Sequence, residues 1–120
     1  MNDELRKART FTTVEALQAL AQSHDPEAWA ALLHQHGGMI MRTARGIVRE
    51  VALAEDVCQE TLLQLRDNAG QFRPPAHEAE AAARAWIVRI ACTTALMLLR
   101  ARRRIQSHEE SCVQQAVRTS

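Results

Sequence analysis

The 120-residue sequence has no tyrosine and only two phenylalanines, two tryptophans, three prolines and four glycines. Proline and glycine interrupt helices, and aromatic residues are enriched in strands. Their scarcity, together with a hydrophobic fraction of 47% that is rich in alanine, favours an all-α fold. A chain of this length forms one domain that buries about two-thirds of its unfolded surface.

Three cysteines, Cys58, Cys92 and Cys112, are odd in number and far apart in the sequence. With no recognisable signal peptide ahead of them, they predict a reducing, cytoplasmic location rather than a disulfide framework. Cys58 and Cys92 are expected to be small buried apolar residues. His34 and His36 fall on different helix faces, so we expect no metal site and no cofactor. The apolar runs fall short of the roughly 20 residues that cross a bilayer, so no membrane association is expected.

Catalytic patterns are also missing. The sequence has no glycine-rich phosphate loop, no nucleophile paired with a base and no carboxylate pair that a cleft could isolate. We therefore expect a protein that is not an enzyme.

What the sequence does have is a separation of charge that its net charge of +1 conceals. Between Glu50 and Asp67 five acidic residues accompany a single base, Arg66. From Ala81 to His108 the sign inverts, and no acidic residue accompanies the arginines, which are Arg84, Arg89, Arg100, Arg102, Arg103 and Arg104. An acidic helix followed by a basic one predicts two partners of opposite charge.

Helical periodicity and capping signals predict a compact bundle of about four helices. The predicted ranges are Thr12 or Thr13 to Gln22, Asp25 to about Arg49, Leu53 to Asn68 and Glu78 to Arg104. Gly37 and Gly38 interrupt the second range and predict a kink or a close helix contact. Residues 1–24 would form an N-terminal helix and extension, residues 25–104 the helical domain, and residues 105–120 a frayed helix end or a polar linker or tail.

The basic helix has two faces. At 100° per residue one arc is apolar and should pack against the core: Trp86, Ile87, Ile90, Ala91, Thr94, Met97 and Leu98. The other arc carries Arg89, Thr93, Leu96, Arg100 and Arg103. Guanidinium groups match phosphate oxygens, so this arc suits nucleic acid, although a solvated face that complements the helix dipole is the alternative.

The segment from Gln71 to Glu78 is predicted to be a loop, because Pro74 and Pro75 cannot continue a helix. Trp86, on the packed arc, is expected to be a core anchor. Phe72 has two interpretations that the sequence leaves open, a platform for a stacked base or a cap on the core.

Three segments, in this order and spacing, resemble region 2 of bacterial RNA polymerase sigma factors, especially the extracytoplasmic-function type. They are DPEAWAALLHQHGGMIMRTARGIV, AEDVCQETLLQL and ARAWIVRIACTTALMLLRARRR. The resemblance covers roughly Asp25 to Arg104. It implies an all-α domain that binds core RNA polymerase and the promoter minus-ten element, and an anti-sigma factor is a possible further partner.

The resemblance also implies residue roles. The acidic helix would dock on the clamp helices of the largest polymerase subunit through Asp56, Gln59, Glu60 and Leu63, which share one helix stripe. The non-template strand of promoter DNA, melted to a single strand, would contact Arg89, Thr93, Leu96, Arg100, Arg103 and Arg104. Base selection would involve the loop residues Gln71, Phe72, Arg73 and His77.

The sequence departs from the family pattern at Thr93, where an asparagine is usual, and at Met97, where an aspartate or asparagine is frequent. The loop and the alanine-rich start of the basic helix also look longer than usual. No helix-turn-helix that would read the minus-thirty-five element follows within these residues. The sequence therefore leaves three interpretations open. The chain is a piece of a longer sigma factor, a single-domain relative, or a sigma-like adaptor or decoy that binds protein without DNA activity.

Overall fold

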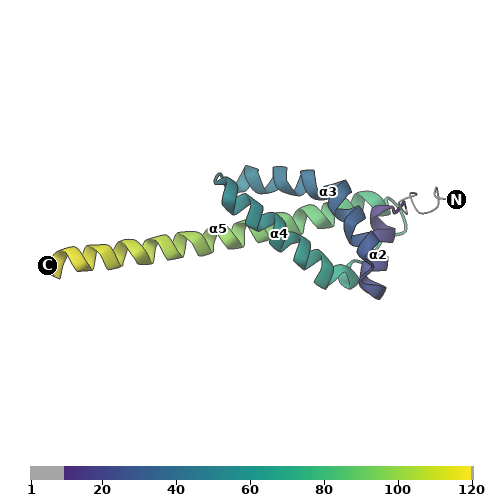
Figure 1. The fold of residues 1–120 in the computed structure, drawn as a ribbon. Coiled ribbons are helices and arrows are strands. Elements are labelled where there is room, and N and C mark those ends of the chain that lie inside the picture. Colours follow the sequence, from purple (N-terminus) through teal and green to yellow (C-terminus); the bar gives the residue numbers. More distant parts are fainter. Residues whose placement is uncertain (1–9, 120) are drawn as a thin grey trace.

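The computed structural model describes residues 10–119, so residues 1–9 of the predicted N-terminal extension and Ser120 lie outside it. It confirms the all-α prediction. The elements are α2 (Thr13–Ser23), α3 (Pro26–Ile47), α4 (Val51–Asn68), the short 3-10 helix η1 (Ala69–Gln71) and α5 (Ala79–Thr119). Figure 1 shows α2, α3 and α4 gathered around the first part of α5.

Local sequence sets the helix starts. Thr12 and Glu15 form a reciprocal capping box at the start of α2. At the next helix the Asp25 side chain accepts a hydrogen bond from the Glu27 amide, and Pro26 stands at the first helical position, as the sequence predicted. Between them His24 takes a left-handed backbone conformation (φ 52°), which lets the chain reverse from α2 into α3.

The two glycines within α3 leave the helix continuous. Figure 1 shows its axis changing direction partway along, in agreement with the predicted kink. The alternative of a close helix contact is wrong. A Cβ atom at Gly37 would meet only the Leu33 side chain, and one at Gly38 only the Arg42 side chain, both within α3 itself.

Two buried clusters hold the bundle together. One joins α2, the first half of α3, the end of α4 and the start of α5 around Leu17, Leu32, Leu65 and Ile87. The other joins the end of α3 to α4 and to the middle of α5, and includes Val48 and Val57 with alanines of all three helices. The small side chains at these crossings let the helices approach closely, because dense packing requires matched shapes.

Several side chains that were predicted to be buried are only half-buried. Cys58 and Cys92 are of this kind. The Cys58 thiol lies 3.8 Å from the Met41 sulfur, and burial together with Glu55 raises its pKa. Cys58 packs at the edge of both buried clusters.

The last helix is longer than predicted. We expected it to end near Arg104 and residues 105–120 to form a frayed helix end or a linker; α5 instead continues as regular helix to Thr119, so the linker alternative is wrong. No proline or glycine follows Gly70 except Pro74 and Pro75, so nothing in the local sequence stops it. Its end projects beyond the other helices (Figure 1), and the molecule extends 74 Å along its long axis.

By length and composition alone, α5 could also cross a membrane. Its apolar first half has another explanation in this fold. Ala83, Ile87, Ala91 and Ala95 are all buried against the other helices. The core helices of soluble proteins share this property, so the observation is weak evidence for a membrane span.

Candidate nucleic-acid and polymerase interfaces

The outward side of α5 carries the residues predicted to contact DNA. We call them the α5 arginine face, and every member is exposed: Arg89, Thr93, Leu96, Arg100, Arg103 and Arg104. The buried residues Ile87, Ala91, Thr94 and Ala95 lie on the opposite side of the helix, as helical periodicity requires. Their neighbour Arg102 is half-buried and donates to both carboxylate oxygens of Glu50 at 3.0 Å. Among residues 10–119 no carboxylate pairs with the arginines of the face itself, so it presents unneutralised guanidinium groups to solvent.

One residue of the predicted packed arc is misplaced. Met97 is 49% exposed and stands beside Leu96, which is 43% exposed. Met97 lies at the edge of the packed arc, where about half of its surface remains open to solvent. An apolar patch consequently interrupts the arginine face in the middle of the helix.

At the start of α5 the loop and the helix enclose a pocket of about 310 Å³, here called the loop pocket. Its walls include Gln71, Phe72 and Arg73 from the loop and Trp86 and Arg89 from α5. The Phe72 and Trp86 rings are 5.5 Å apart between centroids and are tilted by 47°. Two aromatic rings flanked by two guanidinium groups offer stacking surface and phosphate contacts together.

Only some of the residues that were predicted to contact or select bases line this pocket. Gln71, Phe72, Arg73 and Arg89 line it, whereas His77 and Thr93 do not. Trp86 was assigned to the core, and it does pack there, but its half-buried ring is also a pocket wall. Ala82 and Ala85 complete the lining, and helical spacing from Arg89 could have identified both.

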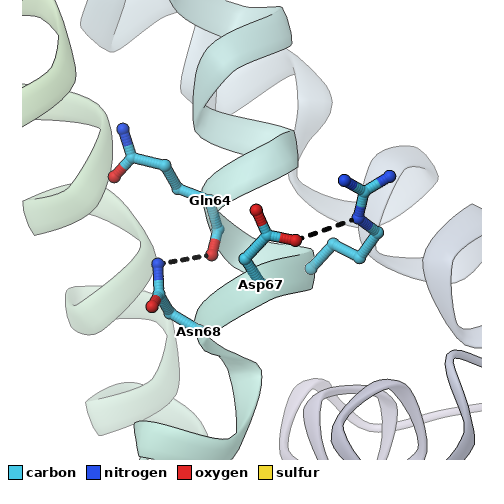
Figure 2. Close-up of polar contacts among 4 residues, drawn as sticks. Gln64, Asp67 and Asn68 are labelled. Carbon is cyan, nitrogen blue, oxygen red and sulfur yellow. Dashed lines mark hydrogen bonds and ion pairs between the residues drawn. The ribbon is translucent and has the colours of Figure 1, made fainter.

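The loop is held by the end of α4. The Asn68 side chain donates to the Gln64 carbonyl, and the Gln71 side chain donates to the Asn68 side-chain oxygen at 3.1 Å (Figure 2 shows the first of these bonds). The Arg73 guanidinium donates back to the Gly70 carbonyl. Gly70 itself is no left-handed helix stop, because α4 passes directly into η1. These bonds give the pocket wall a fixed position.

The outward side of α4 carries the residues predicted to bind polymerase. Asp56, Gln59 and Leu63 are exposed and Glu60 is half-buried, while Val57 on the same helix is fully buried. We call the first four residues the α4 acidic face. In the part of the chain that the structure describes, no cation pairs with Asp56 or Glu60. An exposed leucine (39%) beside unpaired carboxylates is a surface suited to a basic, partly apolar protein partner.

The only basic residue of α4 interacts with side chains outside the α4 acidic face. Arg66 pairs with Asp67 at 3.2 Å, and its guanidinium lies 6.0 Å from the centre of the Trp29 ring (Figure 2 shows the ion pair). Both contacts lie at the end of the helix. The negative charge of the α4 acidic face is therefore not cancelled by its own helix.

A polar cluster that the sequence did not reveal fastens α2 to α5. The Glu80 carboxylate accepts from the Thr13 amide at 2.8 Å and from the Val14 amide at 2.9 Å, so it caps α2 from another helix. Burial raises the pKa of Glu80, but these amides outweigh it and hold the pKa below its usual value.

Buried His36 bonds the Thr13 hydroxyl at 2.9 Å. Burial and the Arg84 charge lower its pKa, against a smaller opposite effect of Glu80. Thr13 therefore joins three helices, because its amide bonds Glu80 of α5 and its hydroxyl bonds His36 of α3. The cluster fixes the start of α5, from which the loop pocket is built.

Comparison with known families places these surfaces in context. No curated protein and no solved structure matches the chain significantly. The sigma-70 region 2 family matches residues 32–105, which is more than half of the chain. Members of this family are transcription factors rather than enzymes, and they act in the cytoplasm with RNA polymerase. The match spans most of α3, all of α4, the loop and the buried part of α5, so this chain belongs to the sigma-70 region 2 family.

Proposed function

We propose that this chain binds core RNA polymerase through the α4 acidic face and holds the melted non-template strand of the minus-ten element on α5 and the loop. The observation that carries the proposal is the position of the loop pocket. It opens where Arg89, the first residue of the α5 arginine face, meets the Phe72 and Trp86 rings. A strand that lies along the arginines thus has a place for one unstacked base at its end.

Within the proposed DNA site, different residues bind the phosphates and read the base. Phosphate contacts by Arg89, Arg100 and Arg103 position a strand but carry no sequence information. The groups that reach a base edge must read it, and Gln71 and Arg73 are the polar side chains that the loop contributes to the pocket. His77 and Thr93 would then contact neighbouring nucleotides. The type of sigma factor that the sequence resembles, the extracytoplasmic-function type, is part of this proposal, as is regulation by an anti-sigma factor.

One observation favours a second function, that of a sigma-like adaptor without DNA activity. Leu96 and Met97 place exposed apolar surface on the α5 arginine face, and Thr93 replaces the asparagine usual in the family. Apolar side chains ringed by arginine are typical of protein interfaces. An acidic protein bound there would compete with DNA for the same arginines.

A salt titration separates the two functions. The variant with Arg89→Ala, Arg100→Ala and Arg103→Ala should bind a minus-ten single strand more weakly, and the slope of log affinity against log salt should fall by about two. Arg118→Ala, at the far end of α5, is the matched control. Unchanged slopes in the triple variant would favour the adaptor, since the arginines would then contact no phosphate.

A further inference from the structure

The second half of α3 has an unusual solvent-facing side. Between Gly37 and Arg49 the exposed residues are only glycines and arginines: Gly38, Arg42, Arg45, Gly46 and Arg49. We call this set the α3 arginine–glycine face. No acidic residue occurs from Ala28 to Arg49, and in the described part of the chain none of the three arginines has an ion-pair partner.

The composition of this face distinguishes between kinds of partner. A protein interface has an apolar or aromatic centre, and here no apolar side chain larger than a methyl group is exposed. Glycine instead lets a partner's backbone approach the helix closely. A Cβ atom built at Gly46 would meet nothing within 4 Å, so the surface there is open. Arginines separated by open backbone fit a polyanion with regularly spaced phosphates.

The dimensions fit a duplex. Arg42 and Arg45 are three residues apart on α3, which is about 4.5 Å along the helix, and Arg49 follows two residues after the helix ends. B-DNA carries roughly one phosphate per 1.7 Å of its axis, counted over both strands. Three guanidinium groups can therefore each meet a phosphate on one side of a groove. The loop pocket and the α5 arginine face already form the proposed binding site for the single strand.

The two arginine surfaces are adjacent at one end of the bundle. Arg49, in the short connection between α3 and α4, and Arg103 on α5 line the same pocket of about 320 Å³, together with the neutralised Glu50–Arg102 pair. DNA that passes from a melted segment to a closed one could thus stay in contact with arginine throughout.

We infer that the α3 arginine–glycine face binds the phosphate backbone of double-stranded DNA next to the melted element. This inference rests on the proposed function only in taking promoter DNA as the partner. It assigns a duplex-binding role to residues that the proposed function leaves unused.

The test uses the intact chain, a closed G·C-rich duplex of about 20 base pairs and a minus-ten single strand, each labelled for anisotropy and titrated with salt. The variant Arg42→Ala, Arg45→Ala, Arg49→Ala should lower the duplex slope by about two to three and leave the single-strand slope unchanged. The variant with alanines at Arg89, Arg100 and Arg103 is the reciprocal control. Its single-strand slope should fall.

A single substitution sharpens the result. Gly46→Glu and Gly46→Gln are nearly equal in size, and both fit because nothing lies near the position. Gly46→Glu should weaken duplex binding roughly tenfold more than Gly46→Gln does, because the added carboxylate would face the DNA phosphates.

An unchanged duplex slope in the α3 variant, or no duplex binding by the wild-type chain, would overturn the inference. Loss of binding to a polymerase clamp-helix fragment, with duplex binding intact, would also overturn it and make the face a protein contact. Failure of the wild-type chain to bind the single strand would count against the proposed function alone, because the duplex measurement is independent of it.

Discussion

Phe72 carries the sharpest prediction, because its position is compatible with both of the roles that the sequence left open. Its ring packs against the core and against Trp86, and it also lines the loop pocket. Substitution by leucine keeps apolar volume but removes the aromatic face. The lost ring pair should lower the free energy of unfolding by about 1 kcal/mol. The Phe72→Ala variant, which also leaves a gap at a half-buried site, should lose about 2 kcal/mol.

DNA binding responds to a different property of the ring. A base stacked on an aromatic side chain contributes about 1–3 kcal/mol, so Phe72→Leu should weaken binding of a minus-ten single strand by roughly 5- to 150-fold. Urea unfolding followed by circular dichroism measures the first effect, and fluorescence anisotropy in native buffer measures the second. The Val14→Ala variant is the control, since Val14 packs against the same core but is absent from the pocket.

The control should lose about 1 kcal/mol of stability and bind DNA as the wild type does. The reasoning fails if Phe72→Leu is destabilised but binds the single strand normally. Phe72 would then be only a cap on the core. The base would have to be held by another group, of which Trp86 is the nearest aromatic one.

Three further predictions concern other parts of the molecule. Asp56→Arg with Gln59→Ala should abolish pull-down by a clamp-helix fragment yet change stability by less than about 1 kcal/mol, since both residues are exposed; intact pull-down would exclude the α4 acidic face. Because the pKa of His36 is lowered on folding, the unfolded chain binds more protons, so stability is full above pH 6.5 and decreases as the pH falls through that value. Urea midpoints across this range measure the slope, which His36→Gln should flatten, and an unaltered slope in that variant would refute the assignment. Deletion of residues 107–119 should reduce the helical circular dichroism signal but leave the urea midpoint unchanged, because these residues are all exposed; a clear fall in the midpoint would show that the projecting helix is docked.

Much of the fold was predictable from local signals. The Asp25-Pro26-Glu27 cap, the paired prolines of the loop and the apolar periodicity of each helix act over a few residues, and the structure agrees with them. The separation of charge between α4 and α5 is likewise a property of the sequence. It survives folding because each charged stripe lies opposite a buried one on its own helix.

Some predictions were wrong where no local signal exists. Helix α5 continues past Arg104, because a polar segment without proline or glycine can extend a helix that the core has already nucleated. Met97 lies at the edge of the packed arc, and only the placement of neighbouring helices decides how much of it stays exposed.

The sequence alone thus determined the all-α fold class, the acidic helix, the basic helix and the proline loop between them. It also determined which residues share a helix face. Tertiary structure decided which distant residues meet. It placed Phe72 against Trp86 in the loop pocket and brought Glu80 to the start of α2. It also placed Arg49 and Arg103 in one pocket at the end of the bundle. Periodicity reports only the direction of a side chain from its own helix axis. What lies in that direction depends on helix crossings, which shape complementarity across the whole core determines.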